Sequence, residues 1–415
     1  MTTIYYLCPD FETPSGGTRE IYWHVWQLRQ GGYDAKVVHQ KSGFRLVWHG
    51  IDVPTISLGD NPPLDMNDVL VIPEGMWSIL KQLTTIDITK IMFVLNWHPS
   101  YWQLPAGEKW SDYGVTGVLT PSQVIADYVQ WRSNLPVTMI SSYINPKLYH
   151  YDARLKKPLI AYTSRKCQDA DIIRDILPEK SDRFEQFNWQ VMNNLSESEY
   201  AQTLQQATFY LTPSPQEGLN ISVLEAMACG CIVIGYHGIG GREFMVGEPD
   251  QGQQNCFTIE NGNLPQFGQV LEQVLINWLD NPQQYEPIIQ NALKTARNYQ
   301  DQQKQKQELA NFFEQFIDQK NLRQSTPTLG AKSPAKGVDA PLSVTKSRGF
   351  SDKKLPQSKQ IKTPLNFSTQ IKIMKSKQAT RKPHLICVKN VKFFQIFTLS
   401  WQQIFLKISS FDKPP

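Results

Sequence analysis

The sequence predicts an α/β protein with two consecutive domains, each built on a sheet of parallel strands. Short apolar runs typical of buried strands alternate with segments of helical spacing, first up to about residue 150 and then again beyond it. Turn and charged residues interrupt this alternation around residues 140–159, which predicts a linker there. A chain of 415 residues also exceeds what one hydrophobic core usually organises. We therefore expect domains at residues 1–150 and 151–320, followed by a tail at 321–415.

The first domain opens with a strand, a turn-rich segment, a helix and a second strand. Residues 3–8 form the apolar run, and a helix begins near Thr18 and stops at Gly31 and Gly32. Residues 35–39 continue as a strand. Further strands of this domain are expected at residues 69–72, 91–95 and 115–119.

The second domain repeats this alternation. Its predicted strands are residues 159–163, 187–191, 208–211 and 232–235. One helix carries the apolar series Ile172, Ile173, Ile176 and Leu177. Another begins at Ser196, where the serine hydroxyl and Glu199 form a capping box. A glutamine-rich helix at about 301–318 ends the folded body.

Charge divides the chain into an acidic body and a basic tail. The first 320 residues contain 24 Lys and Arg against 35 Asp and Glu, whereas residues 321–415 contain 18 against 3. Nucleic-acid binding by the body is therefore not expected. Up to about residue 383 the tail is polar and predicted to be disordered, and its later apolar runs are too short to span a bilayer. Two interpretations of the tail stay open: peripheral contact with an anionic membrane, and an extension without function.

The six cysteines have neither regular spacing nor Cys-x-x-Cys pairs, so neither a disulfide framework nor a zinc site is expected. The first residues lack a basic region followed by a long apolar core, so no signal peptide is expected. A reducing cytoplasm is the expected location.

The segment from Thr212 to Gly235 holds the most informative motif. It leaves a strand, turns, enters a helix near Asn220, stops at Gly230 and returns to a strand. Ligands of open α/β folds bind at such turns, and free amides from about Gly218 to Ile221, including those of Leu219 and Asn220, would face an anion such as a diphosphate. Two carboxylates, Glu217 in the turn and Glu225 in the helix, suit sugar and ribose hydroxyls.

This segment resembles the signature of the family-4 retaining glycosyltransferases, which have two Rossmann-like domains facing a central cleft, the GT-B fold. The resemblance rests on Glu217-Gly-Leu, followed by Leu224-Glu-Ala-Met-Ala and Gly230, and it is sharp only over residues 217–243. It implies that Glu217 approaches the transferred sugar and that Glu225 binds the nucleotide ribose. It also implies a nucleotide-sugar donor, with UDP or GDP as the carrier, and no metal or other cofactor.

Three further segments agree with this resemblance. Arg165 and Lys166, after the first strand of the second domain, resemble the cations that bind the donor diphosphate and stabilise the departing nucleotide. Gly16 and Gly17 resemble the glycine loop that closes over the diphosphate and the acceptor. The turn Gly240-Gly-Arg-Glu243 resembles a G-G-x-x-E turn, for which a purely structural role is equally open.

His98 follows a strand, about where the family often has a histidine near the sugar, although a packed or surface histidine is the alternative. Nearby aromatic residues could form a platform for a sugar ring or belong to the core: Trp97, Tyr101, Trp102 and Trp110. The pair Asp169 and Asp171 resembles a metal motif of a different fold. Because it opens a helix, whose dipole favours acids in the first turn, we interpret it as structural.

The sequence thus predicts a retaining, metal-independent glycosyltransferase with an unidentified saccharide, lipid or protein acceptor. The alternatives are a sugar-nucleotide epimerase or phosphorylase on the same scaffold, and an inactive sugar-nucleotide-binding protein. A dehydrogenase is disfavoured because Gly16-Gly17 does not form a G-x-G-x-x-G fingerprint.

Overall fold

Parallel strands build two sheets, one in each half of the folded chain. The computed structural model describes residues 2–60, 62, 64–97, 104–247 and 252–325, with only the backbone for 318–325. All of these residues fall within one compact unit, Met1–Ser368. The tail predicted at 321–415 lies outside the described residues from 326 onward.

The first sheet has seven parallel strands in the order β3-β2-β1-β4-β5-β6-β7. Its strands are β1 Thr3–Leu7, β2 Asp34–His39, β3 Thr55–Ser57, β4 Val69–Pro73, β5 Thr89–Phe93, β6 Val115–Thr120 and β7 Val137–Met139. The strands predicted from apolar runs are all present. The two outer strands, β3 and β7, were not predicted and contain 3 residues each.

The second sheet has five parallel strands in the order β12-β11-β10-β8-β9. Its strands are β8 Lys157–Tyr162, β9 Asn188–Val191, β10 Ala207–Thr212, β11 Ile232–Tyr236 and β12 Phe257–Ile259. Only β12, at the edge, was not predicted. The α/β fold class with parallel sheets is confirmed.

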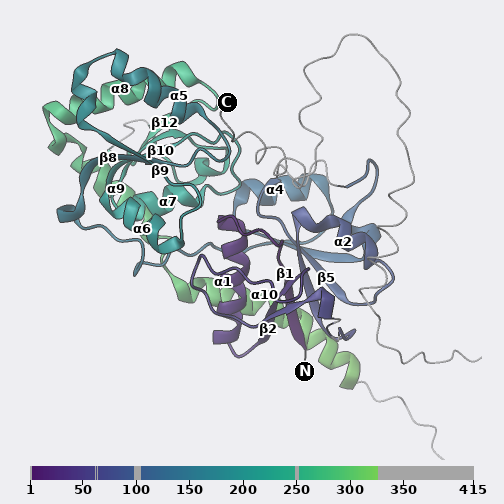
Figure 1. Ribbon diagram of the computed structural model, residues 1–415. Helices are drawn as coiled ribbons and strands as arrows, with labels where there is room; N and C mark the ends of the chain where they lie inside the picture. Colours follow the sequence, from purple (N-terminus) through teal and green to yellow (C-terminus); the bar gives the residue numbers. More distant parts are fainter. Residues whose placement is uncertain (1, 61, 63, 98–103, 248–251, 326–415) are drawn as a thin grey trace, which may run out of the picture. The chain divides into compact units, whose positions relative to one another are not determined.

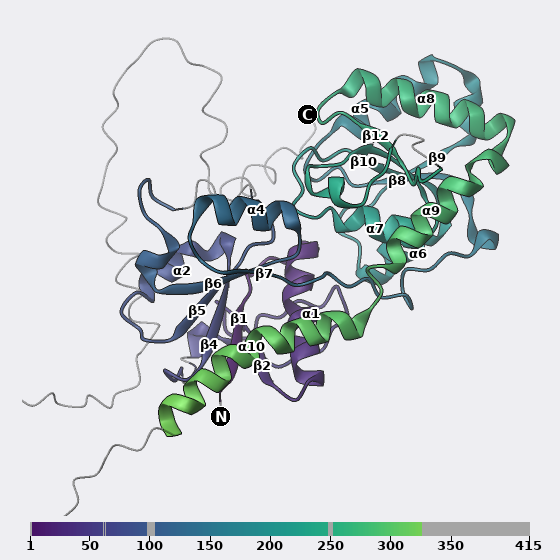
Figure 2. The same cartoon turned by 180° about the vertical axis from the view of Figure 1, so that it is seen from behind.

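Helices flank both sheets (Figures 1 and 2). They are α1 Gly16–Gln30, α2 Trp77–Gln82, α4 Gln123–Arg132, α5 Asp169–Ile176, α6 Glu197–Gln206, α7 Ile221–Ala228, α8 Leu264–Asp280, α9 Glu286–Arg297 and α10 Gln302–Ser325. The predicted signals act where expected: Gly31 is the C-cap of α1, and Ser196 with Glu199 forms the capping box of α6. The start of α1 lies two residues before the predicted one, at Gly16 instead of Thr18.

Alternating side chains of the central strands enter cores on opposite faces of each sheet. In β1, Ile4 and Tyr6 belong to one buried cluster, and Tyr5 and Leu7 belong to another. Strand β10 likewise divides its side chains between two clusters. Because both faces are covered, the strands are apolar throughout instead of alternating with polar residues.

The last helix, α10, packs on the first sheet although it follows the second domain. Phe312 and Phe313 join the core cluster of Ile4 and Tyr6, and Figure 2 shows α10 beside α1. Ser141 also donates to Glu308 through its backbone N–H (2.6 Å) and its hydroxyl (3.0 Å). By packing, this helix belongs with the first domain, whereas the sequence grouped it with residues 151–320.

Candidate active site

The motif adopts the predicted strand, turn, helix and strand. The turn after β10 carries Glu217, which forms an isolated parallel bridge with Ile239. Helix α7 follows at Ile221 and ends before Gly230, whose φ of 71° is readily adopted only by glycine. The ring of Tyr151 occupies the space that a Cβ at position 230 would need.

An ion pair joins Glu217 to Lys166 at the carboxyl edge of the second sheet. Lys166 follows β8, Glu217 follows the neighbouring β10, and Lys166 Nζ lies 2.6 Å from Glu217 Oε2. Both side chains reach solvent, at 40% and 18% exposure. The structure thus brings together two of the residues predicted for catalysis, at the edge where ligands of open α/β sheets bind.

Arg165 lies beside this pair and is exposed. Within the described part of the chain its guanidinium makes no hydrogen bond or ion pair. The loop that carries it is held by Asn193, whose side chain accepts from the Ser164 backbone N–H (3.3 Å) and donates to the Ser164 hydroxyl (2.9 Å). A free cation on an anchored loop is available to a ligand.

Glu225 lies in a different environment from Glu217. It is only 3% exposed, and it pairs with the guanidinium of Arg19 from α1. Arg19 also contacts Glu197 and the hydroxyl of Tyr149, both at 3.0 Å. Burial raises the pKa of Glu225, and the Arg19 guanidinium opposes that rise. The sequence did not identify Arg19, which is 206 residues from Glu225 in the chain.

Asn220 starts α7 in the left-handed conformation, with a φ of 64°. Its side chain donates to the Thr212 hydroxyl (3.1 Å) and accepts from the Ser222 hydroxyl (3.1 Å), and it does not cap the helix. The neighbouring Leu219 is buried in the core at 6% exposure. The amino terminus of α7 therefore lacks a side-chain cap.

Gly218 is needed because another part of the chain approaches it closely. A Cβ at this position would overlap the carbonyl oxygen of Leu95, which follows β5, and its own carbonyl accepts from the Ser122 hydroxyl at 2.8 Å. The closest approach to this glycine is thus made by the protein's own backbone. That a donor phosphate also approaches it stays a prediction.

Gly16 and Gly17 form the start of α1, which has no side-chain cap either. A Cβ at Gly16 would lie 3.1 Å from Ile221 in the first turn of α7, and one at Gly17 would lie 3.2 Å from Leu95. The amino termini of α1 and α7 are therefore neighbours. Two uncapped amino termini concentrate positive potential at one place.

The turn Gly240–Glu243 packs against the motif. A Cβ at Gly240 would overlap the carbonyl of Gly218, and Glu243 Oε1 accepts the backbone N–H of Val124 at 2.9 Å. Glu243 thus binds a free amide at the start of α4, and burial raises its pKa. In this structure the turn has a packing and capping role.

His98, Tyr101 and Trp102 lie outside the described residues. Trp110 belongs to the core, with 3% exposure, and the guanidinium of Arg132 lies 4.8 Å from its ring centre. Trp97 packs partly buried against the same core cluster. Trp110 is therefore a core residue and does not form a platform for a sugar ring.

Asp169 and Asp171 both accept hydrogen bonds from tyrosines. Tyr236 donates to Asp169 and Tyr162 donates to Asp171, each at 2.6 Å. Asp169 is the first residue of α5, as the structural interpretation expects. Among the described residues, no three His, Cys, Asp or Glu side chains gather as metal ligands.

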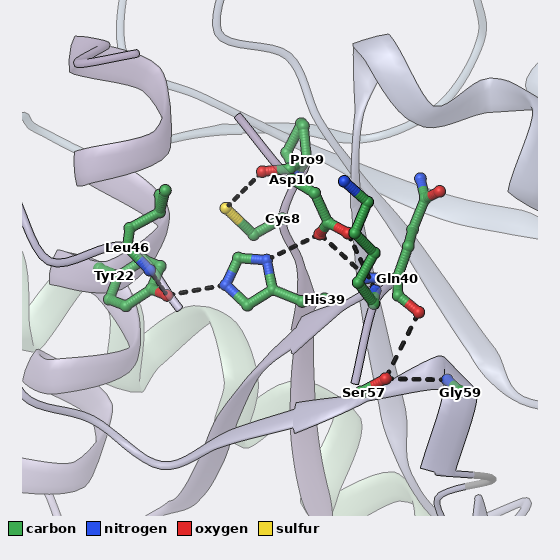
Figure 3. Close-up of polar contacts among 10 residues, drawn as sticks. Cys8, Pro9, Asp10, Tyr22, His39, Gln40, Leu46, Ser57 and Gly59 are labelled. Atoms are coloured by element: carbon green, nitrogen blue, oxygen red, sulfur yellow. Dashed lines mark hydrogen bonds and ion pairs between the residues drawn. The ribbon is translucent and has the colours of Figure 1, made fainter. Parts of the chain in front are cut away.

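A buried chain of polar contacts organises the loops after β1 and β2 (Figure 3). Asp10 contacts His39 Nδ1 at 3.1 Å, and His39 Nε2 lies 2.7 Å from the Tyr22 hydroxyl, which accepts from Leu46 N–H at 3.1 Å. Burial alone would raise the pKa of Asp10, but hydrogen bonds from His39 and two backbone amides lower it. The sequence did not reveal this network because its members come from separate segments.

Known proteins share both the motif region and the fold. Residues 175–277 match the family model described as glycosyl transferases group 1. The chain is also similar to an alpha-1,6-glucosyltransferase of Actinobacillus pleuropneumoniae serotype 7 (strain AP76), with 21% identity over 238 residues, 56% of this chain and 72% of the relative.

Two solved structures illustrate the fold. Sucrose-phosphate synthase from Thermosynechococcus elongatus superposes with a TM-score of 0.56 and 13% identity, over 77% of this chain and all (100%) of that one. The Anabaena protein HepE, solved with UDP and glucose, gives a TM-score of 0.55 and 14% identity, over 76% and 100% of the two chains. None of the described helices is long and apolar enough to span a bilayer. These matches confirm the predicted resemblance to the group 1 family, and the chain is a glycosyltransferase with the GT-B fold.

Proposed function

We propose that this glycosyltransferase is a retaining enzyme that takes its sugar from a nucleotide-sugar donor without a metal ion. One observation carries the proposal: the Lys166–Glu217 pair lies at the carboxyl edge of the second sheet, and its Glu217 is in the turn that leads into the uncapped terminus of α7. A cation, a carboxylate and the amides of an uncapped helix terminus at this edge support the proposal.

Each group has a distinct task in this proposal. The amides at the start of α7, next to those of α1, would bind the diphosphate oxygens. Lys166 and the exposed Arg165 would neutralise the charge that develops on the departing nucleotide. Lys166 would then exchange its contact with Glu217 for a phosphate oxygen, which frees the Glu217 carboxylate to accept a hydroxyl of the donor sugar.

The reaction would proceed on one face of the sugar. The bond between the anomeric carbon and the phosphate oxygen breaks, the acceptor oxygen bonds to the same face, and the acceptor proton passes to the departing phosphate oxygen. No covalent protein nucleophile is needed, so positioning and leaving-group stabilisation supply the catalysis. The ribose role of Glu225 remains part of the proposal, and it requires the buried Arg19 pair to shift. His98 remains the proposed histidine near the sugar.

UDP is the first carrier to test, because the similar Anabaena protein was solved with UDP and glucose. The experiment is a panel of UDP-, GDP- and ADP-sugars followed by thermal shift and nucleotide release, with and without EDTA. We expect one carrier to bind, and slow release to be lost in Arg165→Ala and Glu217→Ala but retained with EDTA. Arg183→Ala, which breaks only an exposed pair with Asp280, is the matched control. Absence of binding to every donor would contradict the proposal.

A further inference from the structure

A pocket of about 820 Å³ lies on the side of α1 that carries Arg19, Trp23 and Trp26. Its other walls come from the segment 47–52, from residues 143–149 and from the start of α6. The backbone N–H of Glu197 donates to the Trp48 carbonyl at 2.8 Å, which joins two of these walls. Lys166 and Glu217 do not line this pocket, but Arg19, which does, pairs with Glu225 of the motif.

Aromatic rings form much of the lining. Trp23 stacks on Trp26, with ring centres 4.9 Å apart and planes 9° apart, and on Tyr143, at 5.2 Å and 6°. Trp48 lines the same pocket and meets His49 edge to face at 4.8 Å. Such preformed aromatic faces suit the apolar face of a sugar ring, at little cost in conformational entropy.

Three lining residues hold buried ring nitrogens that have no partner within the described ranges: Trp23 Nε1, Trp48 Nε1 and His49 Nε2. The two indole nitrogens can only donate. His49 is 4% exposed, and its Nδ1 accepts the Ile51 backbone N–H at 3.2 Å. Burial, with the nearby Arg19 and Arg45, lowers the pKa of His49 to about 4, so the ring is neutral and Nε2 is a donor. Buried donors without acceptors are costly and rare in proteins.

The charges around the pocket are mostly paired already. Arg19 binds Glu197 and Glu225, Arg45 binds Asp52, and Gln305 donates to Glu20 at 3.1 Å. Lys147 is the exposed cation of the described lining. The pocket therefore offers aromatic faces and neutral donors more than it offers net charge.

We propose that this pocket binds a neutral saccharide, whose ring packs on the aromatic faces of the lining and whose oxygens accept from the ring nitrogens of Trp23, Trp48 and His49 once the side chains that cover these nitrogens move. The apolar face of a sugar ring would cover the aromatic rings of the lining, and the sugar's hydroxyl oxygens would accept from the N–H donors that have no acceptor. That the bound saccharide is the acceptor rests on the proposed function, whereas saccharide binding itself does not.

The network of Figure 3 supports the wall that carries two of these donors. The Tyr22 hydroxyl accepts from the Leu46 backbone, the Tyr22 ring lies 4.5 Å from that of His49, and His39 contacts Phe44 edge to face at 4.9 Å. The Asp10–His39–Tyr22 chain thus holds the segment before Trp48 and His49 in place. A rigid wall is what a preorganised binding site requires.

The test uses the full chain and an array of neutral hexose and N-acetylhexosamine oligosaccharides, followed by titration of the best ligand. We expect Trp48→Ala to weaken binding about tenfold or more, through loss of a ring face. Trp23→Phe keeps a ring for the stack but removes one N–H donor, so we expect a three- to tenfold loss. Trp131→Ala, at a tryptophan that is 75% exposed and outside this lining, should leave binding unchanged.

A separate measurement of UDP binding distinguishes this inference from the proposed function. Both pocket variants should bind UDP as the wild type does, and Lys166→Ala should still bind the oligosaccharide. A wild type that binds UDP but no neutral oligosaccharide would overturn the inference and leave the donor site standing. Wild-type oligosaccharide affinity in both Trp48→Ala and Trp23→Phe would also overturn it, as would displacement of the oligosaccharide by UDP.

Discussion

The two glutamates of one motif lie in opposite environments. Glu217 reaches solvent and pairs with the half-exposed Lys166, whereas Glu225 is buried and pairs with Arg19. An exposed pair exchanges partners at little cost, but a buried charge depends on the partner it has. Glu217 is therefore available to a ligand, while Glu225 also holds α1 against α7.

Loss of the buried Arg19–Glu225 pair should lower stability more than any other change proposed here. Arg19→Ala leaves Glu225 and Glu197 without their cation, so we expect the free energy of unfolding to fall by about 3–5 kcal/mol. Chemical denaturation measures this loss. Arg183→Ala removes an exposed pair instead and should cost less than about 1 kcal/mol. Equal losses in the two variants would remove the distinction between the two environments.

Loss of the partly exposed Lys166–Glu217 pair should have the opposite result: activity should fall and stability should stay the same. Glu217→Gln removes the carboxylate that we place against the sugar, so kcat should fall about 100-fold or more. Its melting temperature should stay near that of the wild type, because the lost pair is partly exposed. Glu185→Gln, at an exposed glutamate, is the control. A large fall in stability for Glu217→Gln would mean that Glu217 is structural.

A third carboxylate, Glu74, is buried, and no cation among the described residues pairs with it. Burial raises the pKa of Glu74 to about 7, although backbone amides of Leu95 (3.1 Å) and Asn96 (3.0 Å) donate to it. The unfolded value is about 4.3, so the folded state holds the extra proton between these values. Stability contributed by Glu74 should therefore fall as pH rises from about 4.5 to 7 and level off above. Denaturation across this range should show a flatter profile for Glu74→Gln, and an unchanged slope would contradict this.

Lys166→Ala should change the stability of the protein very little. The variant loses one partly exposed ion pair, so the free energy of unfolding should change by less than about 1 kcal/mol. Donor affinity should fall all the same, because the cation proposed for the diphosphate is gone. Calorimetric titration with UDP measures this affinity, and unchanged affinity would exclude Lys166 from the donor site.

The sequence predicted the central strands because they are continuous apolar runs, and the motif because its glycines and helix signals are local. The edge strands β3, β7 and β12 escaped prediction because three residues give too short a pattern. The sequence did not predict where α10 packs, because the contacts of Phe312 and Phe313 with the first sheet are visible only in the structure.

Within the candidate site, sequence spacing predicted which residues lie near the second sheet's edge, and it paired Arg165 with Lys166. It did not predict that Lys166 alone contacts Glu217, nor that Arg19 neutralises Glu225. Both facts depend on contacts between distant segments. The aromatic pocket escaped for the same reason, since Trp23, Trp48 and Tyr143 come from three separate parts of the chain.

The most direct test of the central claim, that the Lys166–Glu217 edge transfers a sugar, is proton NMR of the reaction of one nucleotide sugar with the wild type and with Glu217→Gln. With an α-linked donor, we predict an α-linked product for the wild type and almost none for the variant. A β-linked product, or equal rates in the two proteins, would contradict the account.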